Sequence, residues 1–297
     1  MLKNGGSIMH NKKIMEILND GRIHLSCELF PPKQGAELQN SLEIVNRIAA
    51  VKPSYMSVTY GAGGSTVGYS AALAKEVQDN GLPALAHLTC VKADEVKITE
   101  VLQQLQGHGV NNILALRGDI PADMQGDHQG RFAHASDLMR FVKEQGDFCV
   151  GGAAYPEGHP ESGSLEQDIE NTKYKVEAGV DFLVTQMFFD NTILYNYMFR
   201  LLRAGINVPV IPGIMPCINA AQIQRMVTMC GAKFPEKFQK IVHRYGDNKA
   251  ALFDAGMSYC ESQIIELLAN DVEGIHLYTM NNVRVAKRLT EGIKNLI

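Results

Sequence analysis

The stretch HLSCELFPP at residues 24–32 has the pattern of a short β-strand that ends at two prolines. Neighbouring side chains of a strand point to opposite faces, so three apolar residues share one face while Ser26 and Glu28 share the other. Proline cannot continue the strand, which leaves Glu28 close to its end. A carboxylate in that place suits either a structural cap or a positioned general acid or base.

Seven more apolar runs of strand length follow, and they alternate with segments of helical periodicity. The strand candidates are residues 24–30, 55–60, 84–90, 112–118, 149–155, 182–188, 208–214 and 274–280. The helix candidates between and after them are residues 38–50, 68–80, 94–106, 134–145, 165–178, 192–204, 219–230 and 282–295. Right-handed crossovers repeated eight times close a parallel sheet into a barrel. The sequence therefore predicts an α/β fold, a (β/α)8 TIM barrel.

Two features depart from a plain eightfold repeat. A short helix near residues 11–19 precedes the first strand, and residues 219–268 hold at least two extra helices, 236–245 and 248–268, before the last strand. No linker or low-complexity tract marks a boundary. We therefore expect a single catalytic domain over residues 1–297.

Composition narrows the class of protein. Hydrophobic residues make up 45% of the 297 residues and charged residues 20%, as in ordinary globular domains. The net charge of −4, without a basic run, argues against a nucleic-acid partner. No apolar stretch approaches a membrane span or a signal core, so we expect a cytoplasmic protein without a membrane partner. The six cysteines stand alone, which predicts reduced thiols and no metal site.

Polar side chains stand at the end of nearly every predicted strand: Glu28, Thr59, His87, Asp119, Tyr155, Gln186 and Asn281. In a barrel these ends meet on one face, where barrel enzymes build their active sites. Strand ends are also polar because loops begin there, so any single residue in the set could be structural. As a set, the acids and amides predict a site on this face.

Two glycine-containing motifs could hold an anion. TYGAGGST at residues 59–66 follows the second strand and opens a helix, where backbone N–H groups can approach a phosphate or a flat ring; a plain tight turn is equally compatible. LRGD at residues 116–119 ends the fourth strand. Arg117 and Asp119 could form a structural ion pair, or Arg117 could bind phosphates while Asp119 faces a developing cation.

The helix after the fifth strand begins at Ser164 with capping-box spacing to Gln167. Asp168, Asn171 and Lys175 share one of its faces, which is either solvated or laid against a long polar cofactor. After the sixth strand, Gln186 can donate and accept at once, as a heterocycle edge requires. Gln222 lies three residues after Asn219, a spacing that also fits a helix cap.

Taken in order, these motifs closely resemble the methylenetetrahydrofolate reductase family in its compact bacterial form. The matching stretches are ELFPP at 28–32, TYGAGGST at 59–66, HLTC at 87–90, LRGD at 116–119, AYPE at 154–157 with His159-Pro160, TQ at 185–186 with FFD at 188–190, PGI at 212–214 and YTMN at 278–281. The resemblance covers about residues 10–297 and all eight strands.

The resemblance implies a set of residues that bind FAD: Thr59, Tyr60, Ala62, His87, Arg117, Gly118, Asp119, His134, Ala135, Tyr155, His159, Asp168, Asn171 and Lys175. Glu28 matches the catalytic acid of the family. Asp119, Gln186 and Gln222 match folate contacts, and Thr59 also matches a position near the nicotinamide.

The implied reaction is a ping-pong reduction of 5,10-methylenetetrahydrofolate to 5-methyltetrahydrofolate, in which NADH or NADPH supplies a hydride through FAD and the product supplies methyl groups for methionine synthesis. Protonated Glu28 would give a proton towards N10 as the imidazolidine ring opens. Ionised Asp119 would stabilise the 5-iminium cation. Both act as catalytic residues. The partners expected are small molecules and further copies of the chain in a homo-oligomer.

The chain departs from the family pattern in two places. Many relatives have an arginine directly after the YTxN motif, where this chain has Asn282, with Arg284 two residues later. Arg284 could take over the folate contact of that arginine, or the contact is absent. Tyr174 stands where a further flavin-contacting basic residue is expected, so phosphate binding would rest more on Arg117 and Lys175.

Three other functions remain open at this point. A barrel methyltransferase that carries folate methyl groups would need no flavin set. A flavin- or folate-binding regulatory subunit would act through a partner, although Glu28, Asp119 and Gln186 are all present. A phosphate-binding aldolase-type barrel would need a Schiff-base lysine at a strand end, and the sequence offers none.

Overall fold

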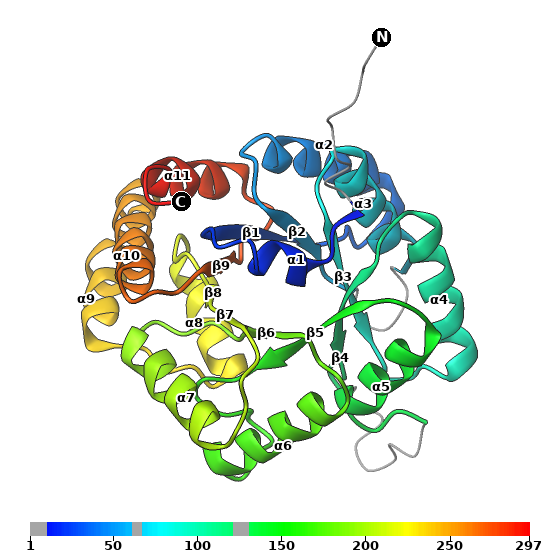
Figure 1. Ribbon diagram of the computed structural model, residues 1–297. Helices are drawn as coiled ribbons and strands as arrows, with labels where there is room; N and C mark the ends of the chain where they lie inside the picture. Colours follow the sequence, from blue (N-terminus) through cyan, green and yellow to red (C-terminus); the bar gives the residue numbers. More distant parts are fainter. Residues whose placement is uncertain (1–10, 61–66, 121–130) are drawn as a thin grey trace.

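The computed structural model describes residues 11–60, 67–120 and 131–297. Within them, nine parallel strand segments form one sheet in the order β7-β6-β5-β4-β3-β2-β1-β9-β8. The strand quoted first, β1 (His24–Leu29), pairs with β2 on one side and with β9 on the other. The sheet curls into a barrel with the helices outside it (Figure 1), so the predicted α/β TIM barrel is confirmed.

The other strands are β2 (Tyr55–Val58), β3 (Ala84–Thr89), β4 (Asn112–Leu116), β5 (Cys149–Ala154), β6 (Phe182–Thr185), β7 (Val210–Ile211), β8 (Gly213–Ile214) and β9 (Gly274–Leu277). The helices are α1 (Ile14–Leu18), the 3-10 turn η2 (Gly35–Glu37), α2 (Leu38–Ala49), α3 (Val67–Asp79), α4 (Glu95–Gly107), α5 (Ala135–Gln145), α6 (Leu165–Glu177), α7 (Asn191–Arg203), α8 (Ala220–Cys230), α9 (Glu236–Tyr245), α10 (Lys249–Ala269) and α11 (Val283–Ile293).

The sequence predicted the seventh strand as one continuous run over residues 208–214, but the structure has two segments there. It is divided at Pro212: β7 pairs with β6, and β8 pairs with β9. Proline has no N–H to donate, so the ladder is interrupted there, although the Pro212 carbonyl still accepts from His276 N at 2.8 Å. The strand that closes the barrel therefore changes partner at this proline.

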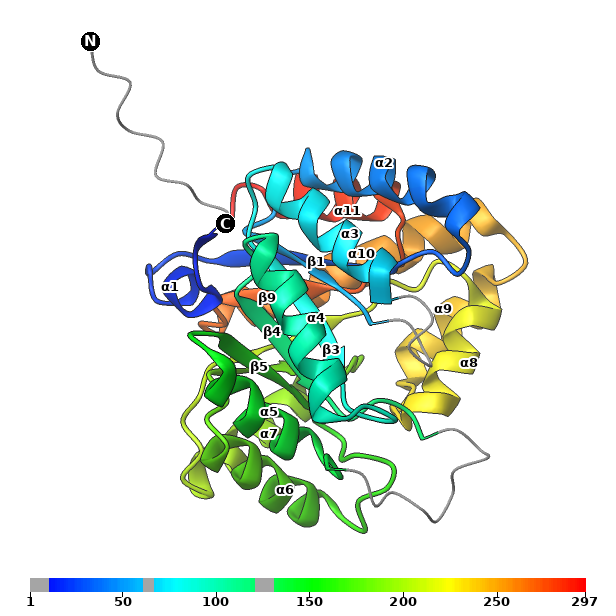
Figure 2. The same cartoon turned by 90° about the vertical axis from the view of Figure 1, so that its right-hand side faces the viewer.

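Two apolar layers lie on opposite faces of the sheet. Leu25, Cys27 and Leu29 belong to the large core between the strands and the surrounding helices, as the alternation in residues 24–32 predicts. A smaller cluster inside the barrel joins Ile14 and Ile17 of α1 to interior side chains such as Phe182. Helix α1, shorter than its predicted range, thus closes the end of the barrel where the strands begin, opposite α8 (Figure 2).

The insertion before β9 folds as α8, α9 and α10, which confirms the two predicted extra helices. An aromatic cluster holds it to the barrel, with the rings of Phe238 and Tyr259 stacked 4.5 Å apart between their centroids. Helix α10 also passes very close to the chain after β8, since a Cβ at Gly256 would lie 1.8 Å from the Cys217 carbonyl oxygen. None of the described helices is long and apolar enough to cross a membrane.

Candidate functional site

Glu28 lies inside the barrel at the end of β1, and its residue is only 5% exposed. Backbone contacts fix this strand end: Thr279 Oγ1 donates to the Glu28 carbonyl oxygen at 2.7 Å. Asn281 donates to the Phe30 carbonyl oxygen and accepts from the Phe30 N–H, at 2.9 and 2.8 Å. Asn281 therefore has a structural role, whereas the Glu28 carboxyl is left facing the interior.

Two histidines flank the Glu28 carboxyl. His87 Nε2 from β3 and His276 Nε2 from β9 each lie 3.6 Å from Glu28 Oε2. Burial lowers the pKa of His87 to about 4, against a smaller opposing effect of Glu28, so His87 is neutral near pH 7. Sequence reasoning missed His276. Its signal was a polar residue in the apolar run GIHL, on the same strand face as an interior position.

The loop after β4 carries the main cation of the site. Arg117 Nη1 and Nη2 each lie 2.7 Å from a carboxylate oxygen of Glu161, so Arg117 pairs with Glu161 rather than with Asp119. Gly118 has a φ of +87°, and a Cβ there would lie 2.9 Å from Val91 Cγ1, which explains the glycine of LRGD. Asp119 is exposed, and its charge acts on Tyr155 and Cys230.

The predicted residues after β5 lie close together beside and along α6. The rings of Tyr155 and His159 meet edge to face with centroids 4.6 Å apart, and Lys175 Nζ lies 5.6 Å from the Tyr155 ring centre. Lys175 Nζ also donates to the Ala153 carbonyl oxygen at 2.6 Å. Burial raises the pKa of Tyr155 to about 12 and lowers the pKa of His159 and of Lys175.

The burial of Asp168 distinguishes the two interpretations of this helix face, which is either solvated or laid against a cofactor. Its residue is 3% exposed and its Oδ1 accepts from Ser162 Oγ at 3.2 Å, while Asn171 Nδ2 donates to the same hydroxyl at 3.4 Å. Burial raises the pKa of Asp168, although Lys175 acts in the opposite direction. The solvated-face reading is wrong for Asp168, because the helix turns it inward.

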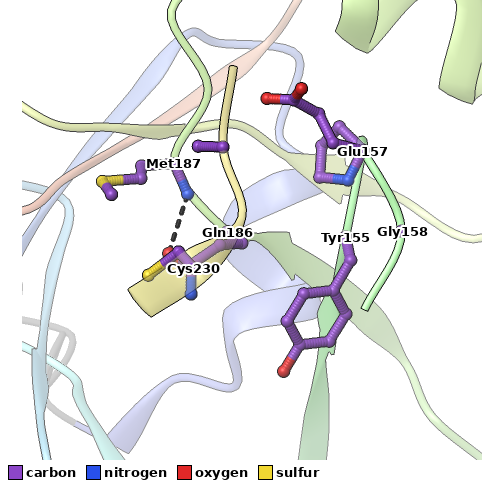
Figure 3. A pocket seen from close by; sticks show the side chains of 8 residues that line it. Tyr155, Glu157, Gly158, Gln186, Met187 and Cys230 are labelled. Carbon is purple, nitrogen blue, oxygen red and sulfur yellow. Dashed lines mark hydrogen bonds between the residues drawn. The ribbon is translucent and has the colours of Figure 1, made fainter. Parts of the chain in front are cut away.

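Gln186 follows β6 and borders a small pocket. Its backbone N–H donates to the Ala154 carbonyl oxygen at 2.7 Å, and its side-chain Oε1 accepts from the Met187 N–H at 2.9 Å (Figure 3). The other residues that line the pocket are Tyr155, Pro156, Glu157, Gly158, Met187, Cys230 and Ala232. Cys230, at the end of α8, was not singled out by the sequence, yet its half-buried thiol faces this pocket beside Gln186.

Two predicted folate contacts, Gln222 and Arg284, lie at helix starts. Asn219 caps α8 by accepting from the Gln222 N–H at 3.0 Å, so capping uses only the backbone of Gln222 and leaves its side chain free for another role. Asn282 caps α11, accepting from the Arg284 N–H at 3.0 Å. The guanidinium of Arg284 stacks on Phe253 of α10, 3.8 Å from the ring centre. A capping role accounts for asparagine at 282.

The remaining predicted flavin contacts are spread along the same strand ends. Thr59 donates its N–H to the Leu29 carbonyl oxygen at 2.9 Å, and Tyr60 is half-buried against the outer core. His134 and Ala135 begin α5, where the His134 N–H donates to Asp137 Oδ2 at 2.9 Å. Ala62 and the rest of the loop 61–66 lie outside the described residues.

A cavity near the barrel lies away from these residues. It has a volume of about 630 Å³ and lies beside α1, lined among others by Lys12, Arg22 and Lys52. None of the predicted site residues borders it. All six cysteines are free thiols, and the described part of the chain holds no His, Cys, Asp and Glu cluster suited to a metal ion.

Residues 13–294 match the family model described as methylenetetrahydrofolate reductase. A 5,10-methylenetetrahydrofolate reductase from Pectobacterium carotovorum subsp. carotovorum is 32% identical over 277 residues, covering 93% of this chain and 91% of that protein. Methylenetetrahydrofolate reductase (NADH) 1 from Zea mays is 35% identical over 284 residues, and the chain spans 48% of its length.

Among solved structures, an uncharacterized protein from Clostridium thermocellum that binds two copies of 5-methyl-5,6,7,8-tetrahydrofolic acid superimposes with a TM-score of 0.66. The alignment covers 96% of this chain and all of that one, at 16% identity. At that identity the likeness supports the barrel fold alone.

Proposed function

The chain belongs to the methylenetetrahydrofolate reductase family, and on that premise we propose that it reduces 5,10-methylenetetrahydrofolate to 5-methyltetrahydrofolate with bound FAD and a nicotinamide donor. The observation that carries the proposal is the buried Glu28 carboxyl between two histidines at the end of β1. The name of the Zea mays relative favours NADH as the donor. Homo-oligomer formation and a cytoplasmic location stay predictions.

The residues at the strand ends fit FAD in two respects. His87 Nε2 and Asp168 Oδ2 are buried polar atoms that find no hydrogen-bond partner in the described part of the chain, as expected where a polar ligand would complete the site. Arg117 and Lys175, both near Tyr155, would supply cations for a pyrophosphate. When bound, FAD would carry the hydride from the nicotinamide donor to the folate.

Glu28 would act as the general acid. Its carboxyl is buried inside the barrel and has no lysine or arginine partner among the described residues. In its protonated form it could give a proton to N10 of the folate as the five-membered ring opens.

Asp119 would have the complementary role. It is exposed, and it lies on the loop directly after β4. A carboxylate beside the folate would stabilise the iminium cation that forms when the ring opens. Gln186 and Gln222 would orient the pterin ring, since a primary amide can donate and accept along one heterocycle edge.

The test follows the visible spectrum of the purified chain under anaerobic conditions, with NADH added first and 5,10-methylenetetrahydrofolate second. The proposal predicts a flavin band that bleaches with NADH and returns with the folate. If the band stays oxidised with both NADH and NADPH, the chain is not the complete reductase. A chain that binds no flavin even after added FAD would instead favour a folate methyl carrier.

A further inference from the structure

Tyr278, the residue directly after β9, reaches across the break in the seventh strand. Its backbone N–H donates to the Ile214 carbonyl oxygen of β8 at 3.0 Å. Its side-chain hydroxyl donates to the Thr185 carbonyl oxygen at the end of β6, at 2.6 Å. One residue therefore joins the end of β9 to both β8 and β6, which lie on the two sides of the interruption at Pro212.

The Tyr278 hydroxyl takes the place of a missing contact between strands. The last pair between β6 and β7 is Val184 with Ile211. A regular continuation of this ladder would bring the Gly213 N–H to the Thr185 carbonyl oxygen. Instead, the Gly213 N–H donates to the Thr185 hydroxyl at 2.9 Å, and the carbonyl oxygen accepts from Tyr278. Thr185 is fully buried, so a carbonyl that lost this donor would find no water in its place.

Gly213 leaves the room that the Tyr278 ring needs. A Cβ at Gly213 would lie 2.5 Å from Tyr278 Cε2 and 2.6 Å from its hydroxyl oxygen, closer than real side chains approach. The Tyr278 ring also meets the His276 ring edge to face, with centroids 5.2 Å apart. Burial raises the pKa of Tyr278, so the hydroxyl keeps the proton that it donates. Packing against two neighbours therefore holds the ring with its hydroxyl at Thr185.

The carbonyl that Tyr278 binds belongs to the peptide group that leads into Gln186. The N–H of the same peptide group, that of Gln186, donates to the Ala154 carbonyl oxygen of β5 at 2.7 Å. Both polar atoms of this peptide group are therefore bound, one by β5 and the other by Tyr278. Because a peptide group is planar, these two bonds fix its orientation and the direction in which the Gln186 side chain leaves the strand.

We propose that Tyr278 is a positioning residue that holds the Gln186 amide in the orientation in which it meets the pterin edge of the folate. Such a contact depends on direction as well as distance, because hydrogen bonds weaken steeply when donor and acceptor are misaligned. Tyr278 thus acts on folate affinity through Gln186. The folate part rests on the proposed function, whereas the hold on Gln186 can be measured in the ligand-free chain.

The first measurement needs no folate. Tyr278→Phe removes the hydroxyl and keeps the ring. The Met187 N–H donates to Gln186 Oε1 at 2.9 Å, so the amide NMR resonance of Met187 reports how the Gln186 side chain lies. We expect Tyr278→Phe to shift or broaden this resonance. Tyr259→Phe is the matched control, since it removes an equally short bond from a tyrosine hydroxyl, to the Phe189 carbonyl oxygen, and should leave the resonance in place.

The second measurement is the dissociation constant for 5-methyltetrahydrofolate, obtained by equilibrium dialysis. Tyr278→Phe should raise it by about three- to tenfold, the equivalent of one hydrogen bond, and leave the dissociation constant for FAD unchanged. Gln186→Ala should also raise it, and Tyr278→Phe should add little in that background, because both changes act through one contact.

Three results would overturn the proposal: additive effects of the two substitutions, an equal loss of FAD affinity in Tyr278→Phe, or a Met187 resonance that Tyr278→Phe leaves in place. A wild-type chain that binds no folate would refute the proposed function instead. The Met187 resonance would then still decide whether Tyr278 holds Gln186.

Discussion

Arg117 and Glu161 form a bidentate ion pair, in which each terminal guanidinium nitrogen lies 2.7 Å from a different carboxylate oxygen. The glutamate side chain is 56% exposed and the arginine side chain 23%, so the pair itself contributes little to folding. The pair holds the guanidinium in place on the loop after β4, and a phosphate would compete with Glu161 for the same N–H groups.

Arg117→Ala should raise the dissociation constant for FAD by about tenfold or more, since a hydrogen bond to a charged group contributes about 1.5–3 kcal/mol. The measurement is quenching of flavin fluorescence as apoprotein is added. Glu161→Gln keeps the cation and removes a competing anion, so affinity should hold or improve. If Glu161→Gln weakens binding as much as Arg117→Ala does, the pair is only a structural clamp. Arg200→Ala, which breaks an exposed ion pair between α7 and α6, is the control.

Glu28→Gln should leave flavin reduction by NADH within a few-fold of wild type and slow the folate step by about 10²–10⁴-fold, the usual contribution of a general acid. The glutamine keeps the size of the side chain but has no acidic proton. Stopped-flow spectra of the two half-reactions separate these effects. Equal losses in both half-reactions would instead assign Glu28 a structural role.

The lowered pKa of His87 predicts that the free energy of unfolding depends on pH. Its pKa falls from 6.5 to about 4 on folding, so the unfolded chain binds more protons than the folded one between those values. The stability gained by keeping His87 neutral is complete above pH 6.5 and is lost as the pH falls towards 4, by at most about 3 kcal/mol. Urea unfolding of the apoprotein at several pH values should show this slope, and His87→Gln should flatten it. Parallel slopes for the two chains would contradict the assignment.

Two helical glycines give a matched test of packing. Gly256→Ala should destabilise the chain by about 1–3 kcal/mol, because its new methyl group would lie 1.8 Å from the Cys217 carbonyl oxygen and force α10 outward. Gly107→Ala, at the end of α4 with open space around it, should be neutral or stabilising by up to about 1 kcal/mol. Urea midpoints compare the two. An unchanged urea midpoint for Gly256→Ala would contradict the close packing of α10 against Cys217.

The barrel and most strand ends were predictable because period-two runs and polar strand ends are local signals. The break at Pro212 was readable in principle, since a proline inside a strand pattern cannot donate to a ladder. Pairings between distant loops were not readable: Arg117 finds Glu161 rather than its sequence neighbour Asp119. His276 was missed because a polar residue inside an apolar run gains meaning only when Glu28 and Ser26 are seen beside it. The sequence left the face that carries Asp168 open between solvent and a cofactor, because helical periodicity does not indicate which polar face turns inward.

The change of partner at Pro212 leaves the seventh strand with only two paired residues on each side. Even the Gly213 N–H, just beyond the proline, donates to the Thr185 hydroxyl at 2.9 Å instead of to a strand carbonyl. The seventh strand is therefore weakly paired within the barrel sheet. We expect its amide hydrogens to exchange with deuterium sooner than those of β3, β4 and β5. Gln186 directly follows the neighbouring β6, so a ligand bound beside Gln186 should slow that exchange. The exchange rate of the seventh strand would then show whether the site is occupied.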